Sequence, residues 1–126
     1  MHEKPQSVTV YIIDDELSVR RALSRLMRAA GLNIQTFSNV DEFERDMVIA
    51  PQGCVIADVH MPGSSPLKLP GRLAKRGIDL PVIYVTGRDS DQVRERARAA
   101  GAIGYFRKPI DDLALIDAVN WATGSP

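Results

Sequence analysis

Apolar residues along the chain alternate between short continuous runs and longer stretches in which they recur every third or fourth position. Five runs are rich in β-branched and aromatic residues and predict strands at 8–13, 33–37, 53–57, 81–85 and 102–106. The first, third and fourth runs are almost uninterrupted, which is typical of strands buried on both faces of a parallel sheet.

The stretch after each run has the spacing of an amphipathic helix. Gly31 is expected to end the first helix, since glycine readily adopts the conformation that follows a helix. Ser38 is expected to cap the second helix and Asp111 the fifth, because their side-chain oxygens accept hydrogen bonds from amides of the first turn. The apolar face of the fifth helix is predicted to comprise Leu113, Ile116 and Val119.

The third helix has a less regular pattern. Ser65 suits its capping position and Pro66 its first helical position. Pro70 is less suitable, because proline inside a helix removes a hydrogen bond and costs about 3 kcal/mol. We therefore expect the helix to begin only after Pro70 and to be short, with an irregular, extended loop before it.

Five successive strand–helix units predict an α/β fold, an open and doubly wound parallel sheet with helices on both faces. The length of 126 residues suits one domain, which we expect to occupy 1–126 with its core at about 7–122.

Charge and cysteine content narrow the functional classes. The 16 basic and 16 acidic residues cancel, which argues against direct binding to nucleic acid or to a membrane. The single cysteine, Cys54, is expected to be a buried structural thiol and fits a cytoplasmic location. Between Lys68 and Lys108 there are ten basic and four acidic residues. These are either ordinary solvated helix faces or a surface for an acidic protein partner.

Polar residues that could support chemistry follow the ends of the predicted strands. In open parallel sheets, sites form beyond the carboxyl ends of the strands, so these side chains should meet at one crevice. Taken singly, each has an ordinary alternative as a helix cap, a turn or a surface bend. The residues concerned are Asp14, Asp15, Asp58, Thr86 and Lys108.

Three converging carboxylates repel one another unless a cation lies between them. Oxygen ligands at a partly solvated edge suit Mg²⁺, for which Mn²⁺ can substitute. We expect Asp15 and Asp58 to bind the metal directly and Asp14 to act mainly through water.

A metal beside a lysine and a hydroxyl suggests phosphoryl transfer, whose transition state spreads negative charge over three oxygens. In this hypothesis Asp58 is the nucleophile and forms an acyl phosphate. The metal, Lys108 and the Thr86 hydroxyl each hold one phosphoryl oxygen.

Four segments carry these residues in a characteristic order and spacing: Ile13-Asp14-Asp15-Glu16, Asp58 with Met61-Pro62-Gly63, Val85-Thr86-Gly87, and Tyr105-Phe106-Arg107-Lys108-Pro109. With them, nearly the whole chain resembles the response-regulator receiver family of two-component signalling. The residues at 85–87, 99–102 and 108–110 are most similar to its FixJ branch.

The resemblance implies a (βα)₅ flavodoxin-like fold with strand order 2-1-3-4-5. It implies Mg²⁺-dependent phosphorylation of Asp58 by a histidine kinase or a histidine phosphotransfer protein. It places a metal-binding backbone carbonyl at His60 and implies that Thr86 and Tyr105 move together as a switch. That movement repacks the face formed by helix 4, strand 5 and helix 5. The Lys108-Pro109 bond is expected to be cis.

This chain departs from the family pattern at two positions over the phosphoryl group. His60 stands two residues after the acceptor, and Arg88 stands two residues after Thr86. Either side chain could tune the lifetime of the phosphoryl group. Pro66 and Pro70 are also unusual and affect the expected course of the third helix.

The five units leave no DNA-reading element, so we expect a single-domain regulator that acts through an unknown downstream protein. Such a receiver catalyses only its own phosphorylation and dephosphorylation. The fourth helix carries Arg94, Arg96 and Arg98 and is a candidate surface for a partner or for a weak or phosphorylation-dependent homodimer. Three alternatives stay open: an aspartyl-phosphate hydrolase, a flavin-binding electron carrier, and a receiver that signals without phosphate.

Overall fold

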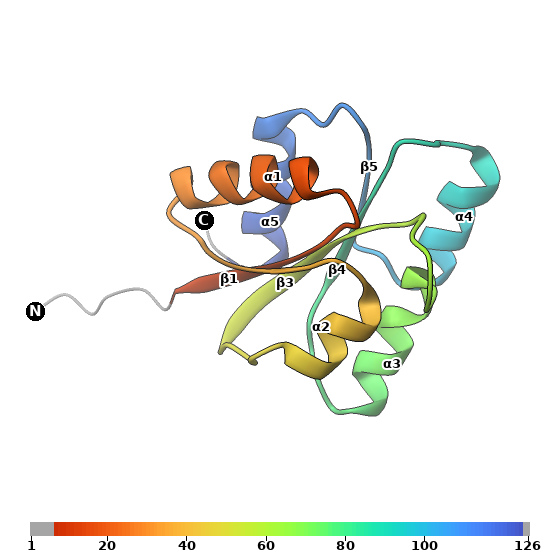
Figure 1. Cartoon of the computed structure of the whole chain (residues 1–126), viewed down its shortest axis with the longest axis horizontal. Coiled ribbons are helices and arrows are strands. Elements are labelled where there is room, and N and C mark those ends of the chain that lie inside the picture. Colours follow the sequence, from red (N-terminus) through yellow and green to blue (C-terminus); the bar gives the residue numbers. More distant parts are fainter. Residues whose placement is uncertain (1–6, 125–126) are drawn as a thin grey trace, which may run out of the picture.

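The computed structural model describes residues 7–124. Its five parallel strands form one sheet in the order β2-β1-β3-β4-β5, as expected from the resemblance. The strands are β1 (Val8–Ile13), β2 (Asn33–Phe37), β3 (Gln52–Asp58), β4 (Val82–Thr86) and β5 (Gly104–Arg107). The helices are α1 (Leu17–Ala29), α2 (Val40–Asp46), α3 (Leu69–Lys75), α4 (Asp91–Ala99) and α5 (Asp112–Ala122). Figure 1 shows α1 and α5 on one face of the sheet and α2, α3 and α4 on the other.

Alternate residues of the central strands fill two separate cores. Tyr11, Val55 and Tyr84 point to the side of α2, α3 and α4. Val10 and Ile56 point to the side of α1 and α5. Because both faces are covered, all residues of β1 and β4 are buried, which confirms the expectation from their uninterrupted apolar runs.

The register of the sheet aligns the ends of the strands that carry the polar residues. Ile13 pairs with Ala57, Asp58 with Val85, and Thr86 with Arg107. Asp14 and Lys108, which follow the ends of β1 and β5, are therefore held at the same edge as Asp58 and Thr86.

Two details of the helices differ from the sequence prediction. The side chain that caps α2 belongs to Asn39 and not to Ser38, whose amide and hydroxyl instead donate to Glu42. In α5, Leu113 is 73% exposed, and Leu115 fills the core in its place. The predicted cap of α5 by Asp111 is confirmed.

The region around Pro66 and Pro70 is more regular than expected. Ser65 caps a 3₁₀ turn at Pro66–Lys68, and α3 follows it directly. The helix begins at Leu69, before Pro70 and not after it. Proline is tolerated in this position because amides of the first turn have no partner within the helix. The expectation of a short helix is confirmed, since α3 has seven residues.

Two residues of β3 lie in close packing. A Cβ atom on Gly53 would lie 2.6 Å from the backbone oxygen of Thr9, so β1 and β3 approach there as only glycine allows. Cys54 is fully buried, as predicted, and burial raises the pKa of its thiol to about 12. Within the described residues, no helix is both long enough and apolar enough to cross a membrane.

Candidate functional site

The turn after β1 gathers three carboxylates. Oxygens of Asp14, Asp15 and Glu16 all lie within 4.8 Å of one another. Asp14 is buried, and its Oδ1 accepts a hydrogen bond from the Glu16 amide at 3.0 Å. Arg20, from the first turn of α1, donates to the Asp14 carbonyl at 2.7 Å and helps to fix the turn. The sequence placed Asp14 and Asp15 here as metal ligands but did not assign Glu16 to the cluster.

Lys108 joins this cluster to the end of β3. Its Nζ atom donates to Asp14 Oδ2 at 3.0 Å and to Asp58 Oδ2 at 3.1 Å. Both carboxylates are almost buried, whereas the lysine side chain is 20% exposed. One ammonium group therefore partly neutralises two acids that the solvent reaches poorly.

Burial and the hydrogen-bonded partners shift the pKa values of Asp14 and Lys108 in opposite directions. Burial raises the pKa of Asp14, and hydrogen bonds from the Glu16 amide and from Lys108 only partly offset that effect. For Lys108, burial alone would lower the pKa, but its hydrogen bonds to Asp14 and Asp58 outweigh burial and raise it. The lysine is therefore held in its charged form beside the two carboxylates.

Thr86 lies at the end of β4 and is fully buried. Its hydroxyl accepts a hydrogen bond from the Arg88 amide at 3.0 Å, and its carbonyl accepts one from the Lys108 amide at 2.7 Å. Among residues 7–124 the hydroxyl proton has no acceptor. The side chain therefore retains a hydrogen-bond donor at the edge of the sheet.

The loop after Asp58 is tied down at several points. The His60 amide donates to Asp58 Oδ1 at 2.9 Å, and Ser64 donates to Asp41 of α2 at 2.6 Å. The Tyr84 hydroxyl, buried beneath the loop, donates to the Pro66 carbonyl at 2.6 Å. These bonds hold the loop around one side of the site.

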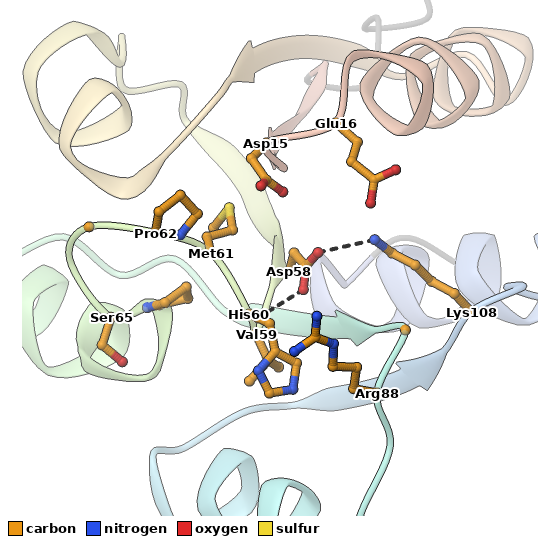
Figure 2. A pocket seen from close by; sticks show the side chains of 13 residues that line it. Asp15, Glu16, Asp58, Val59, His60, Met61, Pro62, Ser65, Arg88 and Lys108 are labelled. Carbon is orange, nitrogen blue, oxygen red and sulfur yellow. Dashed lines mark hydrogen bonds and ion pairs between the residues drawn. The ribbon is translucent and has the colours of Figure 1, made fainter.

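A cleft of about 600 Å³ opens at this edge of the sheet. In Figure 2, Asp58 lies between Asp15 and the side chains of His60 and Arg88, and Lys108 reaches it from the segment that follows β5. The structure thus brings together the strand-end residues that the sequence singled out, with His60 and Arg88 in the same cleft. Asp14 and Thr86 are buried and do not line the cleft.

Tyr105 of β5 lies outside this cleft, on the side of α4. Its hydroxyl donates to Asp89 at 2.9 Å, and the guanidinium of Arg94 lies 5.9 Å from the centre of its ring. The side chain is partly buried and packs against the core on that face. The Lys108-Pro109 bond that follows is cis, as expected.

Comparison with known proteins identifies the family. The model of the response regulator receiver domain matches residues 10–120 of the chain. The chain belongs to the response regulator receiver family. It is thus a receiver domain of the two-component response regulators, a class phosphorylated on an aspartate.

Curated relatives include response regulators from several bacteria. The chain is 36% identical to the response regulator protein TmoT of Ectopseudomonas mendocina, over 96% of this chain and 55% of that protein. It is 36% identical to the transcriptional regulatory protein FixJ of Azorhizobium caulinodans, over 95% of this chain and 57% of that protein. The chain thus spans about half the length of these curated relatives.

Solved receiver structures match almost end to end. A response regulator receiver protein from Burkholderia phymatum superposes with a TM-score of 0.81 at 40% identity, covering 95% of this chain and 98% of that one. The structure named FixJ-N gives a TM-score of 0.82 at 28% identity, covering 95% and 96%. The strand order and the helices on both faces are therefore those of this family.

Receiver domains generally bind Mg²⁺ in an acidic pocket, and the donor set here suits that ion. The cluster of Asp14, Asp15 and Glu16 offers only oxygen ligands, two of them exposed to solvent. Asp58 is not part of the cluster found within the described residues, although Lys108 links it to Asp14. Glu16 could have been noticed from its position, since it directly follows the two aspartates.

Proposed function

We propose that Asp58 accepts a phosphoryl group from a histidine kinase or a histidine phosphotransfer protein. The observation that carries this proposal is the position of Lys108, whose ammonium is bonded at once to Asp14 and Asp58 beside an acidic cluster in an open cleft. This arrangement supplies a nucleophile, a positive charge and oxygen ligands in one place.

In this mechanism a carboxylate oxygen of Asp58 attacks the phosphorus of a phosphohistidine. The new O–P bond forms as the P–N bond breaks, and the donor imidazole leaves with the electron pair and takes a proton. Mg²⁺, when bound, supplies positive charge for the phosphoryl oxygens. We propose Asp15, Asp58 and the His60 carbonyl as its direct ligands and Asp14 as a ligand mainly through water, with Glu16 added because its oxygen lies within the same cluster.

Two further groups of the chain stabilise the transferred phosphoryl group. Lys108 turns its ammonium from Asp58 towards a phosphoryl oxygen, which preserves its charge pairing. Thr86 donates its hydroxyl proton to another oxygen, and this use is supported by the absence of any acceptor for that proton within residues 7–124. The Tyr105 ring moves with Thr86 and changes the face formed by α4, β5 and α5.

That face is the proposed output surface, which binds a downstream protein or a second receiver. This face carries less unpaired positive charge than the sequence suggested, because Arg94 pairs with Asp89 and Arg98 with Glu95. Of the three arginines on α4, only Arg96 has no carboxylate partner within the described part of the chain. Measuring solution size with and without beryllofluoride tests this output. The same monomer in both conditions counts against a phosphorylation-dependent homodimer.

Intact mass after incubation with acetyl phosphate and Mg²⁺ tests the acceptor. We expect one phosphoryl adduct in the parent, none in Asp58→Asn, and an unchanged adduct in Asp79→Asn, which alters an exposed aspartate outside the cleft. A parent that gains no adduct would favour a receiver that signals without phosphate. Turnover of small phosphate esters would instead favour the hydrolase.

The lifetime of the adduct depends, in this proposal, on His60 and Arg88. Both side chains are exposed and line the cleft beside Asp58, where a water that attacks the phosphoryl group must enter. Dephosphorylation rates of His60→Ala and Arg88→Ala should each differ from that of the parent. Equal rates in all three proteins would remove this tuning role.

A further inference from the structure

One carboxylate connects three segments next to the proposed output surface. Asp89 lies in the loop between β4 and α4, and its side chain is only 12% exposed. Its Oδ1 accepts the hydrogen bond from the Tyr105 hydroxyl at 2.9 Å. Its Oδ2 lies 2.7 Å from Arg94 of α4 and 3.9 Å from Arg107 of β5. The two oxygens thus hold β5 and α4 to the same loop.

The same contacts fix the Tyr105 ring from two sides. Its hydroxyl is bound at the loop, and its face lies under the guanidinium of Arg94, which Asp89 itself positions. Burial, with the hydrogen bond and the charge of Asp89, raises the pKa of Tyr105 to about 12. The hydrogen bond from Tyr105 is in turn the main cause that lowers the pKa of Asp89. An ionised carboxylate and a protonated phenol are therefore the stable pair.

Thr86 stands at the other end of this loop, where the Arg88 amide donates to its hydroxyl. Asp89 directly follows Arg88 in the chain. A shift of the Thr86 side chain towards Asp58 therefore pulls on the backbone that carries the partner of Tyr105. The loop couples the acceptor site to the ring over only four residues of chain, 86–89.

We propose that Asp89 is a positioning residue that holds Tyr105 in place and thereby restrains the movement of Thr86. The inference rests on the proposed function, because it assumes that Thr86 and Tyr105 move when Asp58 is phosphorylated. Asp89 contacts neither the metal ligands nor the phosphoryl group, and it acts only through Tyr105 and the loop. Removing its carboxylate frees the ring and lowers the barrier to phosphoryl uptake.

Fluorine NMR of protein labelled with 3-fluorotyrosine reads the ring directly. The chain has three tyrosines, so three signals are expected, and Tyr105→Phe assigns the relevant one. Asp89→Ala should move the Tyr105 signal and leave the Tyr11 and Tyr84 signals in place. Asp89→Asn, which retains an oxygen acceptor, should move it less. Asp91→Ala is the matched control, since this exposed acid at the start of α4 also lies near Arg94, at 3.7 Å.

The second measurement is the rate at which acetyl phosphate modifies Asp58, followed by intact mass. Asp89→Ala should raise this rate about two- to tenfold, the range expected for losing one partly exposed hydrogen bond. In a Tyr105→Phe background the same substitution should have no further effect. Any of four results would overturn the inference: an unmoved Tyr105 signal, an equal shift of that signal in Asp91→Ala, displacement of all three signals, or additive effects of Asp89→Ala and Tyr105→Phe on the rate. If no variant gains an adduct, the parent included, the proposed function fails, and the NMR signals alone decide whether Asp89 positions Tyr105.

Discussion

The hydrogen bond beneath the loop after Asp58 allows a quantitative test of how the site is supported. Tyr84→Phe removes one hydroxyl from a fully buried ring and leaves the ring itself in the core. The Pro66 carbonyl loses its partner at 2.6 Å but keeps the hydrogen bond from the Leu69 amide. Because one bond remains, the carbonyl is not left wholly unsatisfied, and the expected loss is about 1 kcal/mol of unfolding free energy.

Urea unfolding followed by circular dichroism measures that loss. For a domain of this size, about 1 kcal/mol corresponds to a melting temperature lower by roughly 3–6 °C. Tyr105→Phe is the matched control, because it removes the same hydroxyl from a partly buried ring whose partner water can replace, and its loss should be smaller. If Tyr84→Phe unfolds at the same urea concentration as the parent, the bond to Pro66 does not support the loop, and the reasoning is refuted.

Three further outcomes follow from the described contacts. Gly53→Ala should destabilise the sheet by about 2 kcal/mol or more, because its Cβ would meet a strand carbonyl at 2.6 Å. Gly71→Ala in α3, with open space around it, should be neutral or stabilising. Equal melting temperatures for the two variants would contradict this. Hydrogen bonds from Ser38 lower the pKa of Glu42, so its contribution is present above its ordinary pKa and lost as the pH falls through the lowered one. Glu42→Gln should therefore be less stable than the parent at neutral pH and equal to it in acid, which pH-dependent melting checks. Added Mg²⁺ should raise the melting temperature of the parent, and Asp15→Asn should reduce that rise; an equal rise in both proteins would exclude Asp15 as a ligand.

Uninterrupted apolar runs made the central strands predictable from the sequence. A run of this kind has no exposed face, so it indicates both the parallel sheet and the helices that cover it. The ends of those runs then placed Asp14, Asp58 and Thr86 at one edge, where the structure has them. The expected position of Lys108 is confirmed by its bonds to both aspartates.

In two of the three places where the prediction was wrong, neighbouring residues competed for one role. Ser38 and Asn39 are both good capping residues, and only the path of the chain into α2 decides that Asn39 caps it. Leu113 and Leu115 are equally apolar, and the face that α5 turns to the sheet decides which is buried. Pro70 was taken to precede α3, because the sequence does not show that a 3₁₀ turn leads into the helix.

The hydrogen bond between Tyr105 and Asp89 was not predicted from the sequence. The two residues are 16 positions apart, and Asp89, unlike Tyr105, belongs to none of the segments that carry the family resemblance. Their hydrogen bond depends on how the loop before α4 lies against β5, which is a property of tertiary packing.

The buried thiol in β3 has a practical consequence for studying the molecule. Cys54 has no exposed surface, and with a pKa of about 12 fewer than about one in ten thousand of its thiols are ionised at neutral pH. Maleimide and iodoacetamide reagents, which react with thiolates at the surface, should leave the native protein unlabelled. A cysteine introduced on the exposed side of α4 could then carry a dye or spin label as the only reactive thiol, without altering β3.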